Sequence, residues 1–337
     1  MTAEHNPNHI ELTAAEISSL WTAYQEVTAN ICGITFFLIH VEDSNIRRLL
    51  EKYLEIEKDS KQKIEQIFQQ KNHPVPLAFS EKEVNFDAPR LFSDKLYLEY
   101  ILNMTDLSLV AYTGAITMAA RADIIEVYSN MFEMVLELHK QAIELTKEMG
   151  IFIRTPSIPK AKKVEFVEKE SFLTGWFGDR RPLLGVEIAS LSSASRRNSL
   201  GQAVITAFSQ VAENKDVRKY FEKGRDISGK HKEIFNEILN QDYLSNGILM
   251  TPEVTDSTIA PFSDKFMMNL TATLIASGIA QYGAAMSTSP RHDLGVQYTR
   301  LMAEIAKYAN EGANILIENG WMEQPPMAAD RKNLAKK

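Results

Sequence analysis

Three ionisable side chains, Glu57, Asp106 and His139, could share one layer inside a helical bundle. Each lies in a stretch whose apolar residues recur every three or four positions, which is the period of one helix face. At 100° per residue, Glu57 and His139 fall within about 40° of the centres of their apolar stripes. Carboxylate and imidazole groups are common ligands of iron, manganese and zinc. The pattern therefore allows a reduced mononuclear metal site, with Asp106 assisting Glu57 and His139.

The alternative is a buried Glu–His pair with hydroxyl partners, which forms a polar layer in a structural core. A dinuclear site in a helical bundle needs a glutamate on each of two helices and Glu-x-x-His on the other two. No Glu-x-x-His occurs in any predicted helix, and the nearest approach is Glu57-x-x-Ser60. We therefore favour the structural layer and expect no cofactor, with bound iron, manganese or zinc as the alternative.

The equivalent layer of the second half of the chain contains His231 and three serines, Ser199, Ser228 and Ser277. We expect no acid beside His231. A buried histidine that is hydrogen-bonded by its neighbours is the favoured interpretation, and His231 as a metal ligand is the alternative.

The two layers are related by an internal duplication. A shift of 171 residues aligns Leu12–Phe68 with the segment that starts at Leu183, and pairs Glu16 with Glu187. A shift of 170 aligns the later part, in which the Phe-Ser-Asp-Lys sequence of Phe92–Lys95 recurs at Phe262–Lys265. A repeat of this length predicts two copies of one structural unit.

The apolar pattern predicts eight helices, at about 12–40, 45–71, 94–120, 123–149, 183–211, 216–240, 263–289 and 293–318. In each copy a proline-containing segment joins the second and third helices and is long enough to run the length of a helix. Such a crossover is typical of ferritin-like bundles. The sequence therefore predicts an all-α protein with two tandem ferritin-like four-helix bundles, at residues 11–150 and 183–324. The linker, residues 151–182, ends in an aromatic stretch that we expect to dock on a bundle.

The composition excludes several classes of protein. A net charge of −7 argues against a nucleic-acid surface, which needs a basic face. The single cysteine, Cys32, excludes an internal disulfide and a cysteine-based zinc site. No apolar run reaches the roughly 20 residues of a membrane span, and the first residues lack a signal-peptide pattern. We expect a cytoplasmic or spore-associated protein, with unknown protein partners and oligomeric state.

The duplicated bundle, the two Phe-Ser-Asp-Lys helix starts and the joint Phe172–Leu183 (Phe-Leu-x-Gly-Trp-Phe-Gly-x-Arg-Arg-Pro-Leu) resemble a known family. It is a domain-of-unknown-function family of spore-forming Gram-positive bacteria with tandem ferritin-like bundles. It is distantly similar to the spore coat protein F family. The resemblance covers about residues 10–325. It implies the fold, but it carries no catalytic motif to this chain.

Three functional hypotheses follow. The first is a non-enzymatic helical protein with a structural or binding role, connected with sporulation or the spore coat. The second is a metal-binding protein that uses the layer of Glu57 and His139. The third is a binder of a small molecule or a lipid-like ligand in a cavity between bundle helices.

Overall fold

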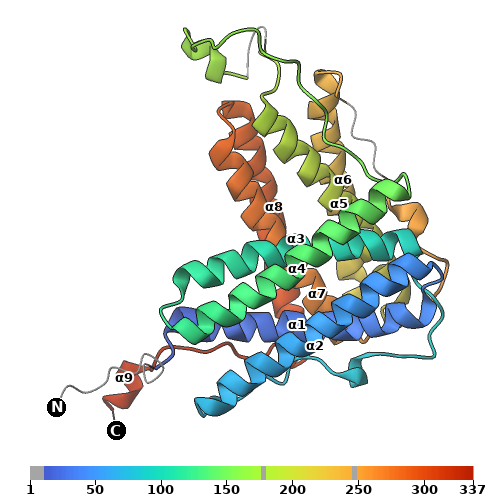
Figure 1. The fold of residues 1–337 in the computed structure, drawn as a ribbon, viewed down its shortest axis with the longest axis vertical. Helices are drawn as coiled ribbons and strands as arrows, with labels where there is room; N and C mark the ends of the chain where they lie inside the picture. Colours follow the sequence, from blue (N-terminus) through green and yellow to red (C-terminus); the bar gives the residue numbers. More distant parts are fainter. Residues whose placement is uncertain (1–10, 176–179, 245–248, 337) are drawn as a thin grey trace. The chain divides into compact units, whose positions relative to one another are not determined.

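The computed structural model describes residues 11–175, 180–244 and 249–336, and the regular secondary structure of this part of the chain is helical apart from one isolated β-bridge. Figure 1 labels its α-helices. The first four are α1 (Ala14–His40), α2 (Ser44–Gln70), α3 (Asp94–Met118) and α4 (Ala122–Glu148). The next four are α5 (Gly185–Val211), α6 (Lys215–Gln241), α7 (Asp264–Thr288) and α8 (His292–Glu318). A short α9 (Arg331–Leu334) and the 3-10 turns Glu81–Glu83, Glu170–Leu173 and Thr251–Glu253 complete the described elements.

The helix bounds confirm the duplication. Both ends of α5 and α6 lie 171 residues beyond those of α1 and α2, and both ends of α7 and α8 lie 170 residues beyond those of α3 and α4. The crossover between the second and third helices is therefore one residue shorter in the second copy. Because each helix pair has equal length, every interior position of one copy has a defined counterpart in the other.

The chain divides into two compact units. Unit 1 holds residues 1–84, 104–142 and 320–337, and unit 2 holds residues 85–103 and 143–319. Unit 1 thus contains α1, α2, the later part of α3 and most of α4. Unit 2 contains α5 to α8 together with the start of α3.

In unit 1, α1 begins with a capping box. The Glu16 backbone N–H donates to the Thr13 hydroxyl, and the Glu16 carboxylate accepts from the Thr13 backbone N–H. This arrangement satisfies two amides that a helix start would leave without a partner. The apolar stripe of α1 is buried, including Leu20, Val27 and Ile34.

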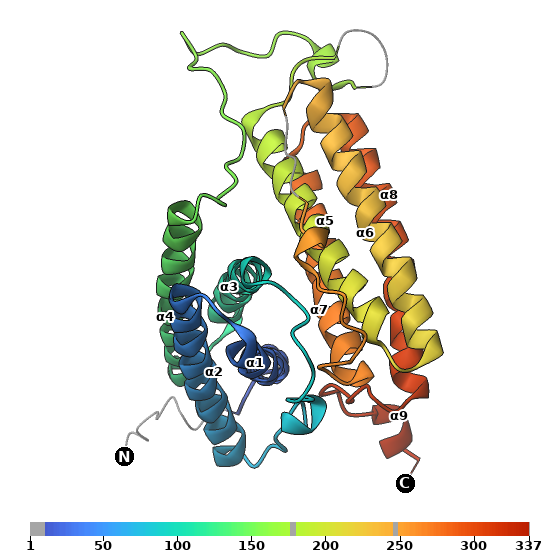
Figure 2. The ribbon, with the colours of Figure 1, turned by 90° about the vertical axis from the view of Figure 1, so that its right-hand side faces the viewer.

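In unit 2, α5 to α8 lie side by side with their axes roughly aligned (Figure 2). Their interior contains one apolar cluster, in which Leu191, Phe235, Tyr298 and Leu301 are almost fully buried. No helix in the described residues combines the length and the apolar character that crossing a membrane requires.

Segments from both crossovers meet inside unit 2. Phe92 and Val254 form an antiparallel bridge. The Ser93 amide donates to the Glu253 carbonyl at 2.9 Å, and the Thr255 amide donates to the Leu91 carbonyl at 3.0 Å. The predicted extended crossovers therefore satisfy part of their backbone through each other.

Candidate functional site

Glu57 lies in the interior of unit 1, where its side chain is 1% exposed. The Asn30 amide donates to one Glu57 carboxylate oxygen at 2.9 Å and to the Tyr53 hydroxyl at 3.0 Å. The second Glu57 oxygen has no hydrogen-bond partner among the described residues. Burial raises the pKa of Glu57 to about 8, although the hydrogen bonds from Asn30 and Tyr53 act in the opposite direction. The carboxyl is therefore mainly protonated at neutral pH.

A second acid, Glu26 on α1, influences Glu57. Its helical phase lies opposite the apolar stripe, which predicts a solvated charge. That interpretation is wrong, because the side chain is partly buried and burial raises its pKa to about 7. The negative charge of Glu26 also contributes to the raised pKa of Glu57. Helical phase gives the direction of the Cα–Cβ bond, and the long glutamate side chain can still reach beneath a neighbouring helix.

The structure brings two of the three predicted metal ligands of unit 1 together. His139 Nε2 lies 3.6 Å from an Asp106 carboxylate oxygen, and His139 Nδ1 lies 2.8 Å from the Thr105 hydroxyl. The Asp106 side chain is 43% exposed. Glu57 instead belongs to the cluster with Asn30 and Tyr53.

A metal ion held by protein side chains ordinarily needs three or more of them. Within the described ranges, no group of three or more His, Cys, Asp or Glu side chains is placed to hold one ion. The Asp106–His139 pair alone does not fit a held metal, so we derive no chemistry through one. The assignment of Glu57, Asp106 and His139 as ligands stays a prediction.

His231 on α6 is fully buried and has a partner at each ring nitrogen. Nδ1 lies 3.2 Å from the Tyr282 hydroxyl, and Nε2 lies 3.2 Å from a Glu304 carboxylate oxygen. The Asn198 amide in turn donates to the Tyr282 hydroxyl at 2.7 Å. Burial lowers the pKa of His231, although Glu304 acts in the opposite direction. This geometry is that of a hydrogen-bonded core histidine.

The expectation that no acid lies beside His231 is wrong, because the Glu304 carboxylate contacts its Nε2 atom. The counterpart of Glu304 in the first copy is Met134, so the repeat gave no signal for an acid at this point of α8. The carboxylate also accepts from Lys230 at 2.9 Å, and these hydrogen bonds lower its pKa although burial acts to raise it. The role of His231 as a metal ligand stays a prediction.

A partly open cavity of about 90 Å³ lies beside this network, between the helices of unit 2. One water molecule needs roughly 10–15 Å³ of such space, so the cavity has room for a small organic molecule. Its apolar wall includes Leu200, Ile205, Ile227, Ile275 and Ile305. Its polar lining includes Arg197, Asn198, Ser228, Thr271 and Tyr282.

The cavity occupies the position that Asn30, Tyr53 and Glu57 fill in the first copy. Their counterparts at the 171-residue shift are Gly201, Gly224 and Ser228, and all three line the cavity. A Cβ atom on Gly201 would lie 3.6 Å from the Ser228 hydroxyl, so this pair faces each other as Asn30 and Glu57 do. The second copy has thus lost all three side chains of the buried cluster. The repeat contained this signal, and our sequence reasoning missed it.

Comparison with protein families settles the relationship of the chain. The model of the family described as "protein of unknown function (DUF3231)" matches residues 1–164 and again residues 171–334. The chain belongs to the DUF3231 family. The two matches also show that each half of this DUF3231 protein is one copy of the family's unit.

Two solved structures are similar to parts of this DUF3231 chain. One is a candidate spore coat protein from Bacillus halodurans C-125, with 20% identity and a TM-score of 0.42, covering 46% of this chain and all of its own. The other is a conserved hypothetical protein from Mycobacterium tuberculosis, with 14% identity and a TM-score of 0.35, covering 43% of this chain and 98% of its own. A comparison with curated proteins gives no significant match.

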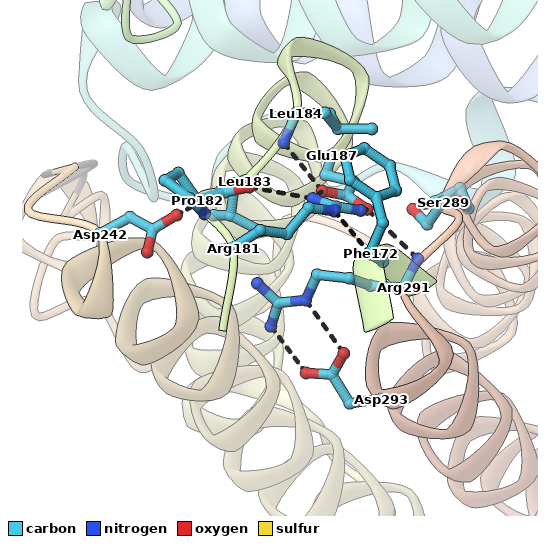
Figure 3. Close-up of polar contacts among 11 residues, drawn as sticks. Phe172, Arg181, Pro182, Leu183, Leu184, Glu187, Asp242, Ser289, Arg291 and Asp293 are labelled. Atoms are coloured by element: carbon cyan, nitrogen blue, oxygen red, sulfur yellow. Dashed lines mark hydrogen bonds and ion pairs between the residues drawn. The ribbon is translucent and has the colours of Figure 1, made fainter. Parts of the chain in front are cut away.

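Phe172 and Arg181, at the two ends of the joint of the DUF3231 chain, contact each other, and Arg181 also contacts the start of α5. That the whole linker docks on a bundle stays a prediction, and Trp176 and Phe177 lie outside the residues that the structure describes. Figure 3 shows Arg181 pairing with Glu187 through two hydrogen bonds of 2.8 Å. The Arg181 guanidinium also lies 4.3 Å from the centre of the Phe172 ring. The Glu187 carboxylate accepts from the Arg291 amide, as that of Glu16 does from the Arg121 amide in the first copy. This cluster has structural partners throughout, so it fixes the joint.

Proposed function

We propose that this protein binds a small molecule in the cavity of unit 2. The supporting observation is the replacement of Asn30, Tyr53 and Glu57 by Gly201, Gly224 and Ser228 at matched interior positions. The structural role favoured by the sequence analysis explains Gly224, against which Tyr308 packs, but gives no reason for a bundle to lose the side chains of Asn30 and Glu57.

The energetics support this assignment. Bundle interiors are closely packed, and around a cavity of about 90 Å³ the lining side chains forgo contacts that a filled interior would give them. A lining of many apolar and a few polar side chains is typical of small-molecule sites, where the polar groups fix the orientation of an apolar body. A ligand would offset the packing loss and gain hydrogen bonds from the polar lining.

The other two hypotheses stay predictions. A role in sporulation or the spore coat, with a cytoplasmic or spore-associated location, derives from the family resemblance. A reduced metal site in unit 1 derives from the phase of Glu57 and His139. The metal hypothesis is tested separately from the cavity by measuring the metal content of the purified wild type and of Glu57→Ala. It requires a stoichiometric metal in the wild type that is lost in the variant.

Saturation-transfer NMR with a library of small fragments tests the binding function on the full chain. Gly201→Leu places a side chain in the cavity, whereas Gly295→Leu makes the same change on α8 where no neighbouring atom lies within 4 Å of the new Cβ. We expect a subset of fragments to bind the wild type and Gly295→Leu but not Gly201→Leu. Fragment binding that survives Gly201→Leu unchanged would contradict the proposal.

A further inference from the structure

The ionisable side chains at this position are acids in unit 1 and an arginine in unit 2. In unit 1 the acid Glu57 lies in the field of a second acid, Glu26. In unit 2 the counterpart of Glu57 is Ser228, and the counterpart of Glu26 is Arg197, which lines the cavity. The cavity of unit 2 is therefore lined by a guanidinium and a hydroxyl, whereas the equivalent positions of unit 1 carry two acids.

The remaining surroundings fit one carboxylate group on an apolar body. Tyr308 fills part of the space that Gly224 leaves, because a Cβ atom there would lie 2.1 Å from the Tyr308 hydroxyl. What remains is bounded by leucine and isoleucine side chains, with the Ser228 and Thr271 hydroxyls on the polar side. The nearby acid Glu304 is held by Lys230 and His231, so its charge is compensated locally.

We propose that the ligand of unit 2 is a small monocarboxylic acid, bound as the anion, with its carboxylate toward Arg197 and Ser228 and its apolar body against Ile227 and Ile305. This inference rests on the proposed binding function and specifies its ligand class. In the first copy the carboxyl group at this position belongs to Glu57. In the second copy, where Ser228 replaces Glu57, the bound ligand would supply it. Arginine suits this role because its planar fork matches a carboxylate and keeps its charge at every physiological pH.

Isothermal titration calorimetry on the full chain at pH 7 tests the ligand class with three probes of nearly equal shape. Benzoate carries the carboxylate, benzamide is its neutral analogue, and benzylammonium carries the opposite charge. We expect benzoate to bind at least tenfold more tightly than benzamide, and benzylammonium not to bind. This ranking needs no mutation, so it is independent of any folding defect.

Two variants then locate the charge. Arg197→Gln should weaken benzoate binding at least tenfold and leave benzamide binding unchanged. Arg225→Gln changes an arginine of α6 that does not line the cavity and pairs with Asp226, and it should change neither. Equal binding of benzoate and benzamide to the wild type, or no effect of Arg197→Gln on their ratio, would overturn the ligand class. The binding function would still hold in that case, provided that Gly201→Leu abolishes fragment binding. If fragment binding is the same in Gly201→Leu as in the wild type, the binding function itself is wrong.

Discussion

The Asn30 side-chain amide donates a hydrogen bond of 2.9 Å to the Glu57 carboxyl in the interior of unit 1, joining α1 to α2. The hydrogen bonds from Asn30 and Tyr53 do not compensate the burial of a charged carboxylate, whose second oxygen has no partner among the described residues. Glu57 therefore keeps its proton, and burial raises its pKa to about 8. The polar layer of the first copy is thus neutral at its centre under conditions in which most glutamates are charged.

This proton makes the stability of the protein fall with rising pH. An unfolded glutamate has a pKa of about 4.3, so between about pH 4.3 and 8 the folded state binds one proton more than the unfolded state. The free energy of unfolding should decrease by about 1.4 kcal/mol per pH unit across this range and level off above it. Glu57→Gln keeps the shape and removes the titration, so it should flatten the slope and stabilise the protein at pH 8. Urea unfolding at pH 5, 6.5 and 8 measures both effects.

Glu133→Gln is the matched control, because Glu133 lies on the exposed face of α4. Its unfolding curves should keep the slope of the wild type. Glu26, whose pKa burial raises to about 7, should leave a residual slope of the same sign in Glu57→Gln. A pH dependence of Glu57→Gln that parallels the wild type would show that Glu57 is ionised in the folded protein.

Glu187 should give the opposite pH dependence. It is fully buried, but the Arg181 side chain and the Leu184 and Arg291 amides outweigh burial and lower its pKa. Because its folded pKa lies below the unfolded value, its stabilisation is present above about pH 4.3 and is lost as the pH falls through the folded pKa. Glu187→Gln should lower the free energy of unfolding by about 3–5 kcal/mol at pH 7, because it leaves Arg181 without its counter-charge. The deficit should shrink in acid.

Chemical denaturation at pH 7 and pH 4 measures this difference. The exposed Glu222 of α6 provides the control, and Glu222→Gln should behave as the wild type at both pH values. Replacing both partners, in Arg181→Met with Glu187→Met, should destabilise less than Glu187→Gln alone, since it removes the buried charges together. Equal losses in the single and the double variant would mean that Arg181 does not depend on Glu187.

The sequence predicted those features that depend on local pattern. The eight long helices and the duplication each follow from spacing along the chain, and the structure has them. It also predicted the proximity of Asp106 and His139. Glu26 was missed because helical phase gives only the direction of the Cα–Cβ bond, and Glu304 because its counterpart in the first copy is Met134. The cavity depends on substitutions on two helices at once, and only the comparison of Asn30, Tyr53 and Glu57 with their counterparts reveals it.

The close approach of α6 and α8 depends on glycine at position 224. Tyr220 and Tyr308 stack with ring centres 4.1 Å apart, and each hydroxyl donates to the backbone carbonyl of the other residue. A Cβ atom on Gly224 would lie 2.1 Å from the Tyr308 hydroxyl, so Gly224→Ala must displace this ring. We expect a loss of about 1–3 kcal/mol in the free energy of unfolding, reduced by up to about 1 kcal/mol through the better helix propensity of alanine.

Thermal unfolding compares this variant with Gly283→Ala, which adds the same methyl group to α7 where no neighbouring atom lies within 4 Å. The control should be neutral or slightly stabilising. Tyr308→Leu restores the residue type of the first copy, Leu138, and should recover part of the loss when combined with Gly224→Ala. Equal melting temperatures for the two alanine variants would show that Tyr308 can move at no cost.

Glu323 ties the segment after α8 to unit 1. Its carboxylate accepts from the Leu77 amide at 2.7 Å, the Ala78 amide at 3.2 Å and the Gln25 side chain at 2.7 Å. Ala78 has a φ of +48°, a left-handed conformation that costs a residue with a side chain about 1 kcal/mol or more. A carboxylate that accepts from two successive amides compensates this cost, because it satisfies both N–H groups in the strained turn. The bonds to Glu323 therefore hold the crossover in place.

Glu323→Gln should loosen this turn, since the neutral amide accepts less strongly than the carboxylate. Hydrogen exchange followed by mass spectrometry should show at least tenfold faster exchange in peptides that contain Leu77 and Ala78, with no change in α5. Glu318→Gln, at the exposed end of α8, should leave exchange at the crossover unchanged. Ala78→Gly removes the strain itself and should slow exchange in the wild-type background and partly restore protection in Glu323→Gln. If Glu323→Gln leaves the protection of Leu77 and Ala78 intact, the turn is held by its own packing and the C-terminal segment contributes nothing to it.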